Sequence, residues 1–421
     1  MANQRIRLTR YTLGDLLDVT RGMSLPGTNY ATSGELIRLT LGNFDYSGNG
    51  FKENTSKDNI YYSGTVPEEF IMSAGDIITP LTEQTPGLLG TTARIPVSGK
   101  YIQSQDVALI TCKPGKLDPL FCYYLVSSSI VKQQLAAGSQ QTKIRHTSPD
   151  KIKACVVYIP DDLTVQHSIG EFLTAIDDKI AVNRKANAEL EVLAKQIYDY
   201  WFVQFDFPDD NGRPYKSSGG KMVYDSTIKR EIPEGWSSNR LGHIVAEVGT
   251  NISVAQRGDL PYTPMDQLPI RKMSFSSSLP TEDAQSSLVK YSKHDILIGA
   301  MRVYFHRVCI APFDGITRTT TLVLRPKQAD YYAYIYERLN ADDFINYAIQ
   351  MSNGSQQPMV SWSSLENMPI LVPKKDIALK YKDLFDGIRD KVISLNLENK
   401  RLSSIRDYLL PLLMNGQANL N

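Results

Sequence analysis

The sequence predicts an α+β protein in which two globular mixed α/β domains are joined by two long antiparallel helices that form a coiled coil. Two observations carry this prediction. An apolar stripe with a period of about 3.5 residues occurs twice, and its second copy follows the first after 212 residues. A set of short motifs also precedes each stripe in the same order. The chain of 421 residues is therefore expected to contain a pseudo-two-fold internal repeat. We name its globular domains the first head and the second head.

Both predicted helices carry a stripe that repeats every three and four residues. The first stripe consists of Leu173, Ile176, Ile180, Asn183, Asn187, Leu190, Ala194, Ile197 and Trp201. The second consists of Phe385, Ile388, Val392, Leu395, Asn399, Leu402, Arg406, Leu409 and Leu413. A period this strict is typical of a coiled-coil seam, since a helix on a globular core has a broader stripe. Asn187 and Asn399 occupy the same stripe position, where buried amides can pair and fix the helix register at a cost in stability.

The motifs before each stripe define the elements of the heads. In chain order, these are a Leu-Gly turn, an Asp-Ile strand, a β-rich run, a helix, the tetrapeptide Gly-Ser-Gln-Gln and a strand ending in proline. They lie at Leu13–Leu16, Gly75–Ile78, Asp106–Ile110, Pro119–Leu135, Gly138–Gln141 and Val156–Pro160, and at Leu241–Ile244, His294–Leu297, Thr321–Leu324, Tyr331–Ile349, Gly354–Gln357 and Pro369–Pro373. The separation of matched motifs falls from 228 to 216 residues within the heads and stays at 212 along the helices. This pattern suits a fixed scaffold that carries two adaptable heads.

These landmarks divide the chain into five segments. We predict the first head at 1–160, the first helix at 161–204, a linker at 205–235, the second head at 236–373 and the second helix at 374–421. The linker is rich in Pro, Gly, Ser and Asp, with turn signals at Asn211-Gly212 and Ser218-Gly219-Gly220. It is expected to be an extended connector, not a core element, anchored at its ends by Trp201 and Trp236.

The composition of the chain argues against a secreted, membrane-spanning or disulfide-bonded protein. The first ten residues lack the apolar region of a signal peptide, and no run is long and apolar enough to span a membrane, so we expect a cytoplasmic protein. The cysteines show no CxxC pairing and are expected to be buried, reduced thiols. A net charge of +1 argues against indiscriminate phosphate binding. Residues 161–235 hold 9 Lys and Arg against 14 Asp and Glu, so if the protein binds nucleic acid, this segment should face away from it or toward a partner protein.

Searches for catalytic patterns find no phosphate-binding loop, dinucleotide fingerprint, HExxH motif, Cys/His cluster or GxSxG elbow. The acidic pairs Asp177-Asp178 and Asp209-Asp210 resemble nuclease motifs only superficially and are interpreted as solvated charge. We therefore expect no catalytic residue and no metal site in this chain. Its function is expected to be the recognition of a ligand.

The loop after each predicted head helix is the first candidate for DNA recognition. Glutamine can pair bidentately with adenine and arginine with guanine, while lysine and serine suit phosphate. The candidates are Ser139, Gln140, Gln141, Lys143 and Arg145 in the first head, and Ser355, Gln356 and Gln357 in the second. A structural alternative stays open for the tetrapeptides, in which Gly138 and Gly354 cap the preceding helices and the glutamines bind backbone.

The segments after the Asp-Ile strands are the second candidate. They contribute Thr82, Gln84 and Arg94 in the first head, and Arg302, Tyr304 and Arg307 in the second. From Arg302 to Arg307 the polar residues alternate with apolar ones, so one strand face could present cations and an aromatic ring to a DNA groove. A solvated strand face would show the same pattern.

A family resemblance extends over the whole chain. Between the heads lie a Trp-Phe-Val-x-Phe-x-Phe-Pro segment beginning at Trp201, the run Gly-Arg-Pro-Tyr-Lys-Ser-Ser-Gly-Gly-Lys-Met-Val-Tyr, and Ile-Pro-Glu-Gly-Trp ending at Trp236. With the ending Leu409–Gly416, these motifs resemble the specificity subunit of type I restriction-modification systems. The heads match that family only in their layout.

The resemblance implies a non-catalytic DNA-recognition subunit. Each head would be a target-recognition domain that reads one part of a bipartite, asymmetric double-stranded DNA site, and the helices would set the spacing. The helices would also dock two adenine methyltransferase subunits, which use S-adenosylmethionine. Two restriction translocase-nuclease subunits, which use ATP and magnesium, would join for restriction. No cofactor is expected on this chain. The alternative is a stand-alone sequence-specific DNA-binding regulator, which the small basic excess disfavours.

Overall fold

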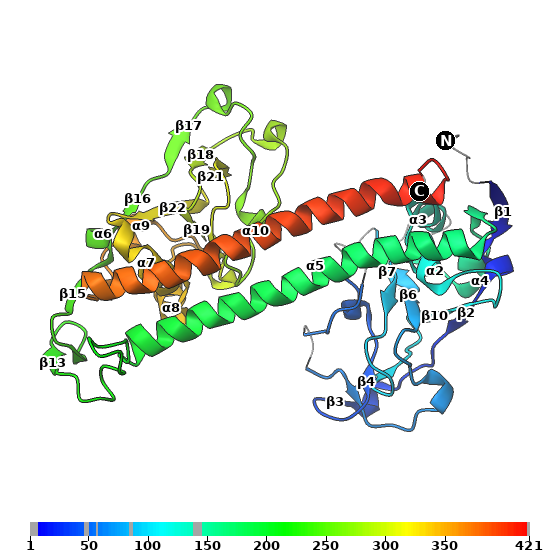
Figure 1. Cartoon of the computed structure of the whole chain (residues 1–421), viewed down its shortest axis with the longest axis horizontal. Helices are drawn as coiled ribbons and strands as arrows, with labels where there is room; N and C mark the ends of the chain where they lie inside the picture. The colour runs from blue at the N-terminus through cyan, green and yellow to red at the C-terminus, as the bar shows by residue number, and fades with distance from the viewer. Residues whose placement is uncertain (1–6, 46–49, 56–57, 84–86, 138–144, 419–421) are drawn as a thin grey trace. The chain divides into compact units, whose positions relative to one another are not determined.

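The computed structural model describes residues 7–45, 50–55, 58–83, 87–137 and 145–418. It consists of two compact units. Unit 1 comprises Met1–Ile180 and Leu402–Asn421, and unit 2 comprises Ala181–Arg401. Each unit holds one head together with one end of both long helices (Figure 1). The predicted α+β class with its internal repeat is confirmed.

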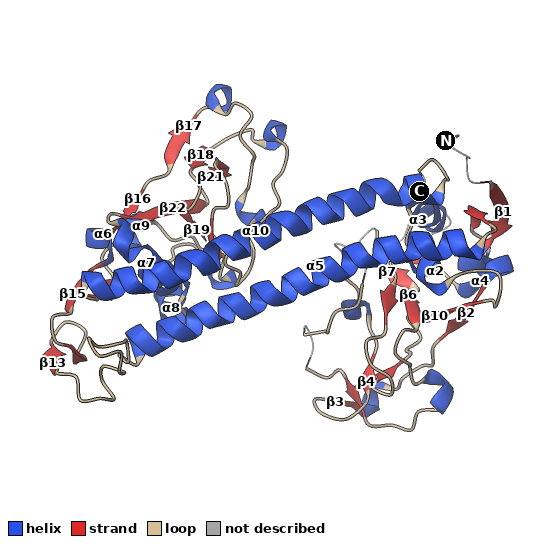
Figure 2. Ribbon diagram, viewed as in Figure 1, coloured by secondary structure: helices blue, strands red, loops and turns tan. Residues whose placement is uncertain are grey.

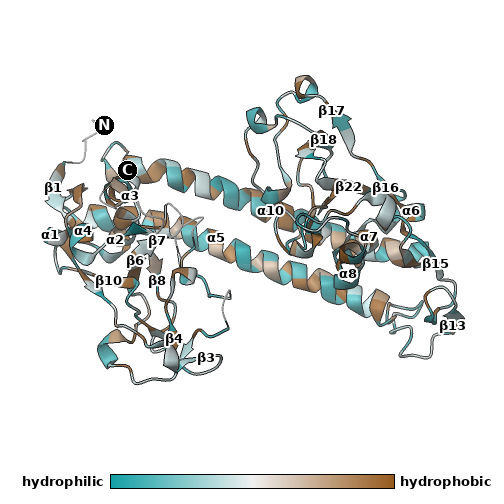
Figure 3. Ribbon diagram, turned by 180° about the vertical axis from the view of Figure 1, so that it is seen from behind, coloured by the Kyte–Doolittle hydropathy of each residue, from teal (hydrophilic) through white to brown (hydrophobic). Residues whose placement is uncertain are grey.

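The two long helices are α5 (Leu163–Tyr198) and α10 (Lys375–Met414), and both are uninterrupted (Figure 2). A π-helical turn at Asp199–Val203 continues α5. Hydrophobic and hydrophilic residues alternate along both helices (Figure 3), as the stripes predict. Within unit 2 the two helices are antiparallel, because Asn183 bonds Asn399 while the later Asn187 bonds the earlier Asn396.

The first head is built around an antiparallel sheet in the order β2-β10-β6-β8. Its strands are β2 (Leu17–Arg21), β10 (Val107–Cys112), β6 (Ile77–Pro80) and β8 (Ala93–Arg94). Beside this sheet, β1 (Leu8–Thr12) pairs with β12 (Val156–Pro160), and β7 (Thr82–Glu83) with β11 (Arg145–His146). A smaller sheet joins β3 (Tyr30–Ala31), β5 (Tyr61–Tyr62), β4 (Ile37–Arg38) and β9 (Tyr101–Ile102).

The helices of the first head are α1 (Leu13–Leu16), α2 (Pro119–Val126), α3 (Ser129–Ala137) and α4 (Pro149–Lys153). The single helix predicted at Pro119–Leu135 is thus two helices. The Ser127 hydroxyl donates to the carbonyl groups of Tyr123 and Tyr124 at the end of α2, a local bond that competes with helix continuation. The core of unit 1 joins α2 and the sheet to α5 and to the end of α10, where Leu413 and Met414 are buried.

The second head repeats this plan with the strand order β16-β22-β19-β20. These strands are β16 (Val245–Glu247), β22 (Thr321–Pro326), β19 (Ile296–Gly299) and β20 (Val308–Ile310). Outside them, β15 (Ser237–Arg240) pairs with β23 (Pro369–Val372), as β1 pairs with β12. A second sheet holds β17 (Thr250–Ile252), β18 (Leu288–Tyr291) and β21 (Gly315–Arg318). The helices are α6 (Leu241–Ile244), α7 (Tyr332–Asn340), α8 (Asp342–Gln350) and α9 (Trp362–Leu365).

The linker contributes to the core of unit 2, which corrects the prediction of a connector without core residues. Phe205, Phe207 and Trp236 are buried there, and the rings of Phe207 and Trp236 stack with centroids 5.2 Å apart. Large aromatic side chains bury enough apolar surface to hold a chain that is otherwise rich in turn residues. The linker also forms a hairpin of β13 (Met222–Asp225) and β14 (Arg230–Pro233). The expected anchor residues Trp201 and Trp236 are both buried.

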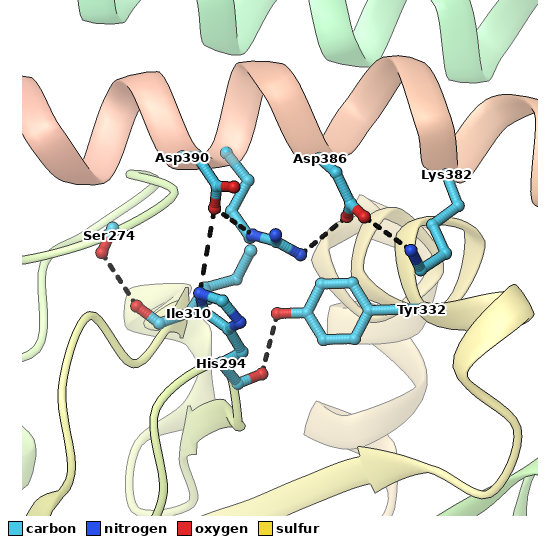
Figure 4. A network of polar contacts seen from close by, with 8 residues as sticks. Ser274, His294, Ile310, Tyr332, Lys382, Asp386 and Asp390 are labelled. Atoms are coloured by element: carbon cyan, nitrogen blue, oxygen red, sulfur yellow. Dashed lines mark hydrogen bonds and ion pairs between the residues drawn. The ribbon is translucent and has the colours of Figure 1, made fainter.

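Polar networks attach each head to the long helices. In unit 2, Arg389 of α10 bonds Asp386 at 2.7 Å and Asp390 at 2.9 Å. Asp390 in turn lies 3.8 Å from the ring of His294, whose carbonyl group accepts a bond from the Tyr332 hydroxyl (Figure 4). Burial, followed by the Arg389 charge, lowers the pKa of His294.

In unit 1, the corresponding attachment uses Asp177 of α5. Its carboxylate accepts bonds from Arg406 of α10 at 2.6 Å and from the Tyr124 hydroxyl of α2 at 2.8 Å. Asp177 is therefore a structural ion-pair partner, which corrects its interpretation as solvated charge. The described cysteines are free thiols, as expected, and Cys122, Cys155 and Cys309 are buried. Within the described residues, no helix meets the length and apolarity that a membrane span requires.

Candidate DNA interface

In the second head, the segment after β19 lies against the tetrapeptide loop. The backbone N–H of Arg302 donates to the carbonyl group of Pro358 at 2.7 Å, and that of Val360 donates to Ala300 at 3.0 Å. Met301 and Met359 form an antiparallel bridge between the same two segments. The structure thus brings together two regions that sequence analysis selected separately.

The tetrapeptide of the second head forms a tight, exposed loop. Asn353 and Met359 exchange two backbone hydrogen bonds, of 3.0 and 2.9 Å, and close the loop at its base. The predicted site residues Ser355, Gln356 and Gln357 are all exposed on it. Gly354 has a φ of 103° and lies beyond Met351, the C-cap residue of α8, so it does not act as the helix cap.

The segment from Arg302 to Arg307 is not the strand that its alternating pattern suggested. Val303–Phe305 form a 3-10 turn, and both Arg302 and His306 adopt the left-handed backbone conformation, with φ of 52° and 53°. Val303 is buried in the core, and the buried His306 ring lies 2.9 Å from both oxygens of Asn340. Tertiary packing at these two residues therefore overrides the local period of two.

This turn changes which side chains are available to a ligand. Tyr304 is 50% exposed, as a DNA contact would require, and its neighbour Phe305 is 41% exposed. Arg302 is only half-buried, whereas Arg307 donates from its guanidinium to the carbonyl groups of Asp266 and Leu268. Sequence analysis missed Phe305, because a strand would have turned it away from Tyr304.

The first head has the same arrangement at the matching place. The strand β7, which follows β6, pairs with β11, and the N–H of Thr147 donates to the Leu81 carbonyl group at 2.8 Å. Thr82 is buried within this pairing, and Arg145 is half-buried and lies 3.3 Å from a Glu83 oxygen. The remaining candidates there, Gln84, Ser139, Gln140, Gln141 and Lys143, lie outside the described residues.

Glu83 is a residue that sequence analysis did not select. Its carboxylate is 2% exposed and accepts hydrogen bonds from the backbone N–H groups of Gly87, Leu88 and Leu89, at 3.0, 2.9 and 3.1 Å. Charge-assisted bonds of this kind hold the backbone at Gly87, Leu88 and Leu89 firmly. The only feature of the sequence that could have revealed Glu83 is its negative charge within a predicted DNA-binding segment. A carboxylate would repel phosphate, so a structural role is the better interpretation.

Arg94 lies on the edge strand β8 with its guanidinium 4.3 Å from the ring centre of Tyr123. One terminal nitrogen, Nη2, is buried and has no hydrogen-bond partner among the described residues. Burial raises the pKa of Tyr123 to about 12, so its ring stays neutral beside the cation. The structure thus gives Arg94 a packing contact.

The register residues of the seam form polar pairs in which Asn183 and Asn187 are buried and Asn396 and Asn399 are half-buried. Asn187 donates to Asn396 at 2.8 Å, and Asn399 accepts from Asn183 at 2.9 Å. Asn187 and Asn399 do not pair with each other, because antiparallel packing places equivalent repeat positions on opposite sides of the seam's midpoint. Their role in setting the register stays a prediction.

The described residues contain no group of three or more His, Cys, Asp and Glu side chains that could hold a metal ion. A cavity of about 310 Å³ in unit 2 is walled by Tyr198, Phe202 and Tyr334. The partly buried cation Arg338 in its wall is paired with Asp343 at 2.6 Å. This pairing satisfies the cation and indicates a structural role.

Comparisons with known proteins show what this chain is similar to. Residues 8–192 match the type I restriction modification DNA specificity domain. The chain is 25% identical over 311 residues to the type I restriction enzyme MjaIX specificity subunit of Methanocaldococcus jannaschii, with 70% of this chain and 68% of that protein covered. It is 22% identical over 377 residues to the HindI specificity subunit of Haemophilus influenzae, with coverages of 75% and 81%.

A solved structure supports the fold over nearly the whole chain. The S subunit of the type I restriction-modification system from M. genitalium aligns with a TM-score of 0.60 at 16% identity and covers 98% of this chain and 97% of that one. The two proteins therefore share a fold. Residues 8–192 belong to the type I restriction modification DNA specificity domain family, and the resemblance of the chain to type I specificity subunits is confirmed.

Proposed function

We propose that this chain is the DNA sequence-specificity subunit of a type I restriction-modification complex, in which each head reads one part of a bipartite double-stranded DNA site. One observation carries the proposal. In each head, the segment after the Asp-Ile strand pairs with the segment after the Gly-Ser-Gln-Gln tetrapeptide. A shared scaffold with different side chains suits two readers of different sequences.

Two adenine methyltransferase subunits are the partners that modify the DNA in this proposal, with S-adenosylmethionine bound to them. Two restriction subunits would supply ATP- and magnesium-dependent translocation and cleavage, so this chain is non-catalytic and binds no cofactor. Exposed apolar side chains on the long helices support docking of a protein there. They are Val182, Val192 and Leu193 on α5, and Leu384, Ile405 and Tyr408 on α10.

Methylation mapping tests the function directly. The chain is co-expressed with the methyltransferase subunit of a type I system, and modified adenines are located in the host genome. We expect methylation at a single motif made of two specific parts separated by a gap of unspecified bases. Cells that express the methyltransferase alone are the control and should lack this motif. A contiguous motif, or methylation that does not depend on the chain, would contradict the proposal, and DNA binding without the methyltransferase would favour a stand-alone regulator.

The helices are proposed to set the gap between the two parts of the site. Inserting four residues at matched positions of α5 and α10 adds about 6 Å to each helix. With about 3.4 Å per base pair, the gap in the methylated motif should lengthen by one or two base pairs. Insertion in α5 alone is the control and should abolish methylation, since the seam loses its register. An unchanged gap in the double insertion would refute this role.

A further inference from the structure

We propose that the turn Arg302–His306 is a base-contacting element, in which the rings of Tyr304 and Phe305 touch the bases of the part-site that the second head reads. This inference rests on the proposed function and adds the residues that determine specificity in that head. Both rings are exposed, and their centroids lie 4.9 Å apart with an angle of 49° between the planes. They form one apolar tip on the surface of unit 2.

The turn holds these rings in a fixed position. Two residues other than glycine take the left-handed conformation, Arg302 and His306, and each such residue costs about 1 kcal/mol or more unless its surroundings impose it. The surroundings are the buried Val303 side chain, the contact of His306 with Asn340, and the bond from Arg302 N–H to Pro358. Backbone strain of this kind gathers at ligand-binding sites, because packing has fixed the conformation before binding.

The groups around the tip match DNA. The exposed loop of Ser355, Gln356 and Gln357 is joined to the same turn through Met301 and Met359. Hydroxyl and amide groups contact phosphates and base edges, while a phenylalanine ring offers no hydrogen bond to a phosphate. Apolar side chains that contact DNA meet thymine methyl groups or the faces of bases, and so they report on sequence.

The internal repeat favours DNA over the methyltransferase as the ligand of the tip. A surface that docks two identical partner subunits should recur in both heads. At the matching place the first head has Gln84-Thr85-Pro86, which contains no aromatic residue. The two aromatic residues are thus present in the turn of the second head and not at the matching place of the first. In the proposed function the two heads differ in the bases that they read, so the turn is suited to that role.

The test uses the complex with the methyltransferase and three duplexes that carry the mapped motif, either intact or with one of its two parts scrambled. Phe305→Ala and Tyr304→Ala should each weaken binding to the intact duplex by about tenfold. In both variants, scrambling one part of the motif should then cost about tenfold less affinity than in the wild type, while scrambling the other should cost as much as in the wild type. Tyr224→Ala, which removes a ring that is 68% exposed on the linker hairpin, is the matched control and should bind like the wild type.

Each other outcome overturns the inference in a recognisable way. Equal losses on all duplexes with a shallower salt dependence would indicate a phosphate contact. Loss of co-purification with the methyltransferase would indicate a protein-docking surface, and unchanged discrimination would exclude a role in specificity. Phe305→Leu keeps an apolar side chain and should retain partial discrimination, and equal melting temperatures exclude misfolding as the cause. If the wild-type complex does not distinguish the duplexes, the proposed function fails, and the inference fails with it.

Discussion

Glu337 is a buried acid that the candidate interface does not use. It lies on α7 in the core of unit 2, is 5% exposed, and burial is the main reason why its pKa is raised to about 8. Lys195 opposes this shift, while Asp199 and Glu191 add to it. At neutral pH the folded protein therefore holds this carboxyl group mostly in its protonated form.

The free energy of unfolding should accordingly fall as the pH rises from about 4.5 to about 8. In this window the unfolded chain releases a proton that the folded chain keeps, at about 1.4 kcal/mol per pH unit for a fully buried group. Glu337→Gln cannot ionise, so its stability relative to the wild type should increase from pH 5 to pH 8. Urea unfolding at both pH values measures this, with the exposed Glu231→Gln as control. A constant difference between Glu337→Gln and wild type would show that Glu337 ionises normally.

The local structure of the candidate interface residues was predictable where it depends on neighbouring residues. The exposed glutamines Gln356 and Gln357 lie where a glycine-containing polar loop was expected. Phe305 and Glu83 were missed, because their positions depend on a turn forced by distant packing and on three backbone N–H groups that a carboxylate gathers. These contacts join residues that are distant in the sequence or depend on the packing of the whole head. A pattern of neighbouring residues therefore does not predict them.

At the scale of elements, the two glycines inside the long helices have opposite surroundings. A Cβ added at Gly170 of α5 would lie 2.6 Å from the Cβ of Leu120 and 2.7 Å from the backbone N of Phe121. A Cβ added at Gly387 of α10 would have no neighbour within 4 Å among the described residues. Gly170 therefore permits the close approach of α5 and α2.

Alanine at these positions should have opposite effects on the free energy of unfolding. Gly387→Ala should stabilise the protein by up to about 1 kcal/mol, because glycine is a poor helix former. Gly170→Ala should destabilise it by about 1–3 kcal/mol, because the clash outweighs the gain in helix propensity. Thermal unfolding of the two variants checks both signs. Stabilisation by Gly170→Ala would mean that α5 and α2 can separate at little cost.

The elements themselves were largely predictable, for a reason that the helices illustrate. In α5 and α10 the apolar period is repeated over many residues, so a few residues that depart from it do not change the predicted helix. In a short segment, one or two such residues are enough to make the prediction wrong. The alternation from Arg302 to Arg307 covers too few residues to resist the packing of Val303 and His306. The division of the first predicted head helix into α2 and α3 likewise occurs at a single residue, Ser127, whose hydroxyl bonds the end of α2.

At the scale of the whole molecule, the first head is completed by a distant part of the chain. Leu413 and Met414 of α10 are each 1% exposed in the core that also contains Leu173 of α5 and the sheet of the first head. Unit 2, in contrast, is continuous in sequence from Ala181 to Arg401. Damage to the end of α10 should therefore affect the first head and leave the second intact.

Leu413→Ala should lower the stability of unit 1 by about 2–5 kcal/mol, the usual cost of removing a buried leucine side chain. Hydrogen exchange followed by mass spectrometry should show faster exchange in β2, β6 and β10 and unchanged exchange in β19 and β22. Tyr408→Ala, on the same helix but 70% exposed, is the control and should leave both heads unaffected. Faster exchange in the second head would show that the two units do not unfold separately.

Unit 1 is built from both ends of the chain, so it cannot be completed until synthesis on the ribosome is nearly finished. The first head and α5 emerge early, but the part of α10 that covers them emerges only after all of unit 2. At typical translation rates this interval is roughly 10–40 seconds. Throughout it the apolar stripe of α5 is uncovered, so we expect nascent chains to engage chaperones there. In a chain that terminates early, this stripe stays exposed. We expect such a chain to be recognised by chaperones and proteases and degraded.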